Sequence, residues 1–257
     1  MKQRGISKRI SQCAQFAVLV ASVAAISFVT TGFQGKGGGG GGTTPPPNPE
    51  IAFADSGIKV MNADGTNVRT VVALKKGEGA RAPTWSSDGQ SLAYFGSHSG
   101  AVGIYTVRLD GTQRTRIVLF PSDGLITFTD WSRSAGPNGQ KLLAFVAEFP
   151  GDIYNDVYVV NPDGTGLLNL TQTPDDFETD CAWSSDGSRL YVVRMLPTGI
   201  QFELREILLG VDGSGNVTKI GDTMLYQAPA AEFVFLRTSN TGDRLVFSNL
   251  YNSTTLG

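Results

Sequence analysis

The sequence predicts an all-β fold, and three observations carry this prediction: recurring turns, recurring tryptophans, and short alternating runs between them. Asp-Gly pairs followed by Thr or Ser begin at positions 64, 110, 163 and 212, with spacings of 46, 53 and 49 residues. Trp85, Trp131 and Trp183 follow the first three pairs after 20 or 21 residues. Apolar and polar residues alternate between these markers, which is typical of strands.

Each repeat contains four short strands in a fixed order. The first leads into the Asp-Gly turn, as Val157–Val160 does, and the second follows it, as Leu167–Leu170 does. The third ends in Trp-Ser, and a second Asp-Gly turn opens the fourth, Leu190–Val193. Gly adopts the positive φ that tight hairpin turns require. The turn residues predicted in this way are Asp64, Gly65, Asp88, Gly89, Asp110, Gly111, Asp163, Gly164, Asp186 and Gly187.

Two repeats depart from this pattern. The second repeat carries an insertion, Arg133–Asn138, in the turn after its tryptophan. In the last repeat the tryptophan is missing, and Phe233 or Phe235 is expected near its position, followed by a final strand at Arg244–Phe247.

Four strands in each repeat of about 50 residues predict a β-propeller of four-stranded antiparallel blades. Both faces of such a sheet are covered only when neighbouring blades stack around an axis. We therefore expect Trp85, Trp131 and Trp183 to pack between blades, because large aromatic rings mostly contribute buried area; stacking on a ligand is the alternative. Residues 51–257 hold about four repeats. Either four blades close through strand exchange between the termini, or the ring is incomplete or irregular, which we favour.

The repeat resembles that of a known family. Trp85–Tyr94 and Trp183–Val192 are similar to the Trp-Ser-Pro-Asp-Gly repeat of the TolB-like β-propellers, and Val157–Thr165 is similar to the other half of that repeat. Ser87 and Ser185 stand where the family has proline, which leaves the Asp-Gly turn intact.

This resemblance covers residues 51–250 and implies an exported propeller that binds a protein. In TolB itself the propeller binds the peptidoglycan-associated lipoprotein, and an α/β domain precedes the propeller. Here a Gly- and Pro-rich linker occupies residues 35–50, so we expect no such domain and no role in that particular system.

The first 34 residues are typical of an export segment. Four basic side chains lie within residues 1–9, and the uncharged stretch that follows is largely apolar over Phe16–Phe33. This pattern indicates either a signal peptide, cleaved near Val23–Ala25, or an uncleaved N-terminal membrane anchor. In both cases we expect the propeller at 51–257 to be extracytoplasmic, in a bacterial-type periplasm, with the membrane involved only through an uncleaved N-terminus.

The exported part is acidic. Residues 1–50 hold five of the 21 basic and one of the 23 acidic side chains, so 16 basic and 22 acidic residues remain, a net charge of −6. Such a charge argues against a nucleic-acid partner. Cys181 is the only thiol beyond residue 50, so it has no disulfide partner there, and we expect a buried thiol acting as a small apolar side chain.

Acidic side chains gather in two connections that we expect at one end of the propeller. They could bind Ca²⁺ through carboxylate oxygens or attract a basic partner, or they could form a solvated acidic loop. The candidate binding residues are Asp152, Asp156, Asp175, Asp176, Glu178 and Asp180.

Catalytic signatures are weak. The chain has no Gly-x-Ser-x-Gly motif, and the nearest string, Gly96–Gly100, has His98 at its centre, the only histidine. We expect His98 to be a solvated loop residue. We therefore predict no catalytic residues and no cofactor other than Ca²⁺, and a non-enzymatic module that presents loops to a protein or cell-envelope polymer. The alternative is a propeller-type hydrolase or lyase acting on peptide or carbohydrate with paired carboxylates.

Overall fold

The computed structural model describes residues 50–120, 126–149, 154–197, 201–229, 232–239 and 244–250. Within these ranges every regular element is a β-strand, and no helix long and apolar enough to cross a membrane is found there. The export segment at 1–34 and the linker up to residue 49 lie outside the described residues.

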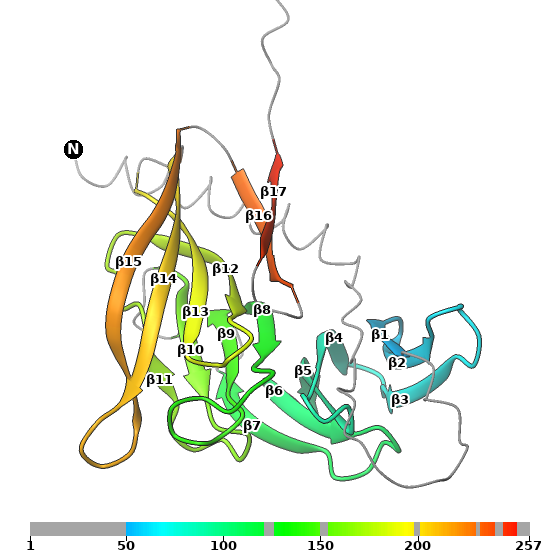
Figure 1. Cartoon of the computed structure of the whole chain (residues 1–257). Helices are drawn as coiled ribbons and strands as arrows, with labels where there is room; N and C mark the ends of the chain where they lie inside the picture. Colours follow the sequence, from blue (N-terminus) through cyan, green and yellow to red (C-terminus); the bar gives the residue numbers. More distant parts are fainter. Residues whose placement is uncertain are drawn as a thin grey trace, which may run out of the picture.

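The strands form five antiparallel sheets that follow one another along the chain (Figure 1). The first contains β1 (Glu50–Ala54), β2 (Gly57–Asn62) and β3 (Arg69–Ala73). The second contains β4 (Gly79–Trp85), β5 (Ser91–His98), β6 (Ala101–Arg108) and β7 (Thr115–Phe120). The third contains β8 (Ile126–Trp131), β9 (Leu143–Ala147), β10 (Asp156–Val160) and β11 (Leu168–Asn169). The fourth contains β12 (Phe177–Trp183), β13 (Arg189–Met195), β14 (Gln201–Val211) and β15 (Val217–Pro229), and the fifth β16 (Glu232–Thr238) and β17 (Leu245–Leu250).

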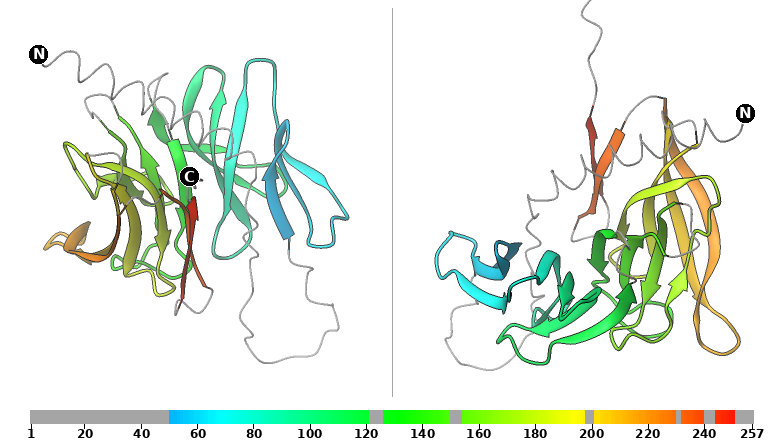
Figure 2. Two further views of the ribbon diagram at one scale, coloured as in Figure 1. Left: turned by 90° about the horizontal axis from the view of Figure 1, so that it is seen from above. Right: turned by 180° about the vertical axis from the view of Figure 1, so that it is seen from behind.

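The sheets are arranged as propeller blades. Strands β4, β8, β12 and β16, each the first of its sheet, contact one another in sequence, and β1 contacts β4 (Figure 2). The predicted fold, an all-β propeller with four-stranded antiparallel blades, is confirmed. Three sheets have four strands, and no strand pairing in the described ranges joins the first sheet to the last.

The sheets do not coincide with the sequence repeats, because each sheet begins in the middle of a repeat. Each four-stranded sheet begins with a strand that ends in a tryptophan, so it unites the last two strands of one repeat with the first two of the next. Each sheet-to-sheet connection, such as that from β11 to β12, therefore lies inside a sequence repeat.

The Asp-Gly turns repeat the same hydrogen bonds. In the turns at Asp64, Asp110 and Asp163, the Oδ1 atom of Asp accepts the backbone N–H of the Thr two residues later at 2.9 Å and the hydroxyl of that Thr at 2.6 Å. Only the glycine of each pair has positive φ, 88° at Gly164. A Cβ at Gly164 would also lie 2.6 Å from the carbonyl oxygen of Ile117, so the neighbouring sheet requires glycine there too.

Apolar clusters fill the spaces between neighbouring sheets. The ring of Trp85 packs with the first and second sheets, that of Trp131 lies between the second and third, and that of Trp183 between the third and fourth. Trp183 is the most buried of the three, with 1 % of its surface exposed, and its Nε1–H donates to the carbonyl of Asp130 at 3.2 Å.

The last repeat places a polar residue where the others have tryptophan. The Ser239 N–H donates to the carbonyl of Arg244 at 2.9 Å, as the serine after each aligned tryptophan does in its own turn. The tryptophan position is therefore taken by Thr238, and the expectation that Phe233 or Phe235 stands near it was wrong. Thr238 is buried, and its hydroxyl donates to the carbonyl of Trp183 at 2.7 Å, so a hydrogen bond between sheets replaces ring packing.

The insertion in the second repeat connects sheets. Arg133 donates from Nη1 to the carbonyl of Ser239 at 2.7 Å, and the hydroxyl of Ser134 donates to the carbonyl of Ser185 at 2.6 Å. The β8–β9 connection thus binds the β12–β13 turn of the fourth sheet and the β16–β17 connection of the fifth.

Candidate functional site

The predicted acidic group lies around the β11–β12 connection and the start of β10. Asp152 falls outside the described residues. Asp175 is exposed in the β11–β12 loop, and Asp176, beside it, is half-buried. The remaining three carboxylates are buried and have defined partners.

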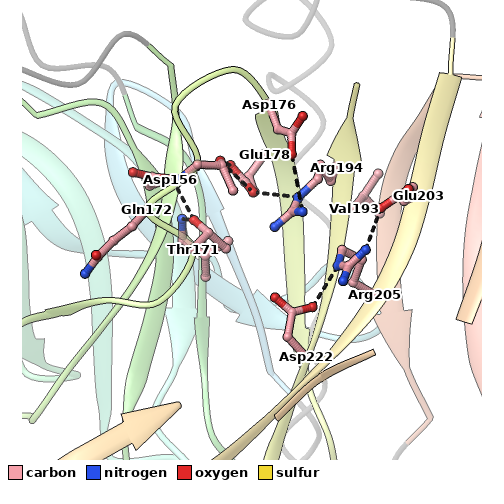
Figure 3. Close-up of polar contacts among 12 residues, drawn as sticks. Asp156, Thr171, Gln172, Asp176, Glu178, Val193, Arg194, Glu203, Arg205 and Asp222 are labelled. Carbon is pink, nitrogen blue, oxygen red and sulfur yellow. Dashed lines mark hydrogen bonds and ion pairs between the residues drawn. The ribbon is translucent and has the colours of Figure 1, made fainter. Parts of the chain in front are cut away.

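Asp156, the first residue of β10, holds the neighbouring strand and loop. Its Oδ1 accepts the Thr171 hydroxyl at 2.7 Å and the Thr173 backbone N–H at 3.1 Å (Figure 3). Its Oδ2 accepts the side-chain amide of Asn169 at 2.7 Å. One carboxylate therefore fixes the end of β11 and the first half of the loop that follows.

Glu178 and Asp176 share one arginine. Arg194 donates from Nε to Glu178 Oε1 at 3.1 Å, and its Nη1 lies 3.3 Å from Asp176 Oδ2, so Figure 3 shows it between the two carboxylates. The Thr173 hydroxyl donates to Glu178 at 3.1 Å. Glu178 is fully buried, and this burial raises its pKa to about 7 despite the Arg194 charge, while partial burial also raises the pKa of Asp176.

Asp180 faces the opposite side of β12. Its Oδ2 accepts the Leu236 backbone N–H at 2.8 Å and lies 3.4 Å from Arg237 Nη1, while Oδ1 accepts the Cys181 N–H at 2.8 Å. Burial raises the pKa of Asp180 to about 7 and holds the pKa of the Cys181 thiol well above its usual range.

A β-bulge explains this separation. Glu178 pairs with Arg194 of β13, and Asp180 pairs with the adjacent residue, Val193. Because adjacent residues of a strand point to opposite faces, the two acids do so as well. The structure thus brings Asp156, Asp176 and Glu178 together and assigns Asp180 to the interface between the fourth and fifth sheets.

Two members of the site were missed from the sequence. Arg194 lies two residues after Val192 on the same face of β13, and a charged residue at such a core-facing position was an available signal. Asn155 precedes β10 and carries no comparable signal. It is fully buried, its carbonyl accepts the Glu178 N–H at 3.1 Å, and neither polar atom of its side chain has a hydrogen-bond partner among the residues that the structure describes.

A second arginine site lies beside the first on β14 and β15. Arg205 donates from Nη1 to Glu203 and from Nε to Asp222, both at 2.7 Å (Figure 3). Lys219 Nζ lies 3.4 Å from the same aspartate. The charges on this part of the fourth sheet are therefore mostly paired with each other.

Asp156, Asp176, Glu178 and Asp180 are paired with arginines, hydroxyls and N–H groups rather than with one another. Over the described ranges, no group of three or more His, Cys, Asp or Glu residues is placed to hold a metal ion. Binding of Ca²⁺ stays a prediction. Asp152, one of the residues predicted to bind it, lies outside the described residues.

His98 differs from the expectation of a solvated loop residue, which was wrong. It is the last residue of β5 and 6 % exposed, with its ring edge-on to Tyr105 at 4.7 Å between ring centres. Strand alternation places it on the same face as Tyr94, whose hydroxyl oxygen lies 2.9 Å from Nε2. That face packs against the first sheet, which buries the imidazole.

Comparison with known proteins agrees with this fold. No family model matches the chain. The Tol-Pal system protein TolB of Alcanivorax borkumensis is 36 % identical over 86 residues, 33 % of this chain and 18 % of that protein. A solved structure titled a putative TolB from Agrobacterium tumefaciens aligns with a TM-score of 0.53 and 20 % identity, over 79 % of this chain and 71 % of that one. The described sheets form a TolB-like β-propeller.

The TolB-like fold is also shared with an enzyme. An oligogalacturonate lyase in complex with manganese aligns with a TM-score of 0.56 and 15 % identity, over 75 % of this chain and 54 % of the lyase. At such low identity the likeness shows the fold alone. The alignment with the curated A. borkumensis TolB spans about a fifth of that relative's length.

Proposed function

We propose that this TolB-like propeller is an exported, non-enzymatic binding module that presents its loops to a protein or polymer of the cell envelope. One observation carries the proposal. The base of the β11–β12 loop is held by buried carboxylates, whereas Gln172, Pro174 and Asp175 at its tip are exposed.

A loop of this kind suits recognition. Asp156 and Glu178 restrain Thr171 and Thr173 from beneath, so the exposed residues between and beyond them have less freedom to lose when a partner binds. Rigid strands that position variable loops are a common basis of binding sites.

The same contacts weigh against catalysis by these acids. A pKa near 7, as at Glu178, is a feature of catalytic acids, and it would make this residue the first candidate. However, Glu178 is fully buried, and its oxygens accept hydrogen bonds from Arg194 and Thr173. A substrate therefore has no direct access to its proton. Its raised pKa is explained by the burial that fixing the loop requires.

The relatives indicate the kind of partner. Proteins named for the Tol-Pal system share the repeat, which supports an extracytoplasmic location and a protein partner. Because the part beyond residue 50 has a net charge of −6, we propose that the partner's surface is basic.

Site-specific crosslinking tests this proposal. A photo-crosslinking residue placed at Asp175 should yield one defined adduct when the full chain is exported in its host. Ser214 is the matched control, since it is equally exposed but lies in the β14–β15 turn, at the opposite end of the blade. The same adducts from both positions would contradict a partner at the β11–β12 loop.

The second candidate function is that of a hydrolase or lyase, because an oligogalacturonate lyase has the same fold. Purified protein incubated with oligogalacturonate should release unsaturated product, detected by ultraviolet absorbance, if the chain is such an enzyme. Release of that product by the unaltered protein, with no defined adduct at Asp175, would favour the enzyme over the binding module.

A further inference from the structure

One nitrogen of the single histidine lies between two groups of opposite charge. His98 Nδ1 is 3.3 Å from Arg114 Nη1 and 3.5 Å from Glu78 Oε2. Glu78 comes from the β3–β4 loop and Arg114 directly precedes β7, so two separate connections converge on the end of β5. The side chains of His98 and Glu78 are only 5 % and 8 % exposed.

A neutral imidazole can satisfy only one of these two groups. If Nδ1 accepts a hydrogen bond from Arg114, the ring proton is on Nε2 and is donated to the Tyr94 hydroxyl oxygen, 2.9 Å away. In this state the Glu78 carboxylate receives nothing from the ring and is held by the Lys75 backbone N–H at 2.9 Å.

A protonated imidazole has the opposite preference. Nδ1 then carries a proton, so it no longer accepts from Arg114, and two positive charges repel each other at 3.3 Å. The carboxylate of Glu78 becomes the natural acceptor for this proton. With the neutral ring protonated on Nε2, this N–H donates to Tyr94 both before and after Nδ1 gains its proton, so the contact with Tyr94 is unaffected.

We propose that His98 is a proton-operated switch that exchanges Arg114 for Glu78 on acidification, and thereby ties the β3–β4 loop to the end of β5 while releasing the guanidinium. The switch lies where the first and second sheets meet, because Tyr94 and Tyr105 pack in the same cluster as Val72 of β3.

The other ionisable groups around His98 do not compete for this role. Tyr94 on β5 and Tyr105 on β6 face the ring, and burial raises the pKa of Tyr94 well above its usual range, so it stays neutral. Burial and the Arg114 charge lower the pKa of His98, while Glu78 opposes them, which is the balance that an exchange of partners requires.

The third sheet shows what this position needs for packing alone. Phe145 and Tyr158 are a cross-strand pair equivalent to Tyr94 and Tyr105, and the ring that completes the trio there is Phe149, 4.8 Å from Tyr158. An aromatic ring without a titratable group therefore fills the equivalent position. Since packing requires only a ring, the imidazole adds something that Phe149 cannot supply.

The test is a proton titration of the imidazole by NMR on the full chain, where one histidine gives one signal. Glu78→Gln should lower the titration midpoint of His98, and Arg114→Gln should raise it. Arg116→Gln is the matched control, an exposed arginine two residues away, and should leave the midpoint unchanged. Shifts of both variants in the same direction, or no shift in either, would overturn the switch.

A second measurement covers a variant that fails to fold. In the unaltered protein, the guanidinium signals of Arg114 should move with the same midpoint as the imidazole, because the two groups separate as the ring is protonated. If the Arg114 signals stay constant through that midpoint, no exchange of partners occurs and the proposal fails.

Discussion

The carboxylate of Asp180 accepts the backbone N–H of Leu236 at 2.8 Å and so joins the fourth sheet to the fifth. Asp130 forms the same kind of bond one interface earlier, where its Oδ2 accepts the Trp183 N–H at 3.1 Å. Burial raises the pKa of both acids. Hydrogen bonds between the first strands of neighbouring sheets thus accompany the apolar packing between blades. The strength of these hydrogen bonds depends on the protonation of the two acids.

The Asp180 pKa gives stability a defined dependence on pH. Folding raises this pKa from 3.8 to about 7, so the folded state holds the proton more tightly, and stability falls as the pH rises from about 4 to about 7. Asp180→Asn cannot ionise and should flatten this decline. The free energy of unfolding, measured by denaturant at several pH values, checks this. Asp175→Asn, at an exposed position, should leave the slope unchanged, and a wild-type slope in Asp180→Asn would contradict the assignment.

Removing Arg194 should destabilise the protein strongly. Arg194→Met leaves Glu178 buried without its cation, and breaking a buried ion pair costs about 3 kcal/mol. Denaturant unfolding measures this loss. Arg189→Met is the control, because its pair with Glu206 is more exposed than that of Arg194 with Glu178 and is worth about 1 kcal/mol or less. Equal losses in the two variants would show that Arg194 does not hold the site together.

Two glycines with similar φ should tolerate alanine differently. Gly65 and Gly164 have φ of 82° and 88°, so alanine is strained at both, by about 1–2 kcal/mol. Only at Gly164 would the new Cβ meet backbone, 2.6 Å from the oxygen of Ile117, whereas nothing lies within 4 Å at Gly65. Thermal unfolding should therefore show a larger loss for Gly164→Ala. The reverse order would contradict the close approach of the second and third sheets.

His98→Phe should make the fold less sensitive to acid. The pKa of His98 is lowered in the folded protein, so the unfolded chain binds the proton more readily and stability falls as the pH drops below about 6.5. Phenylalanine keeps the ring packing, as Phe149 does in the third sheet, and removes the pH dependence that the imidazole contributes to stability. The difference in melting temperature between variant and wild type should grow on acidification, and a constant difference would argue against a buried, titrating His98.

The candidate site was only partly predictable. The concentration of carboxylates between Asp175 and Asp180 directs attention to the β11–β12 loop from the sequence alone. Their division could not be foreseen, since the bulge that turns Glu178 and Asp180 to opposite faces depends on the pairing of β12 with β13. The place of Arg194 in the site depends on the same strand pairing, which sets it opposite Glu178 on the next strand.

Local order was determined by the sequence itself. Glycines at positive φ and strand alternation act over a few residues, so the Asp-Gly turns and the all-β propeller followed from spacing alone. Which strands share a sheet, which side chains meet across an interface, and whether His98 is buried were decided only in the tertiary structure. These depend on contacts between segments far apart in the chain, such as the hydrogen bond from the Thr238 hydroxyl to the carbonyl of Trp183, 55 residues earlier.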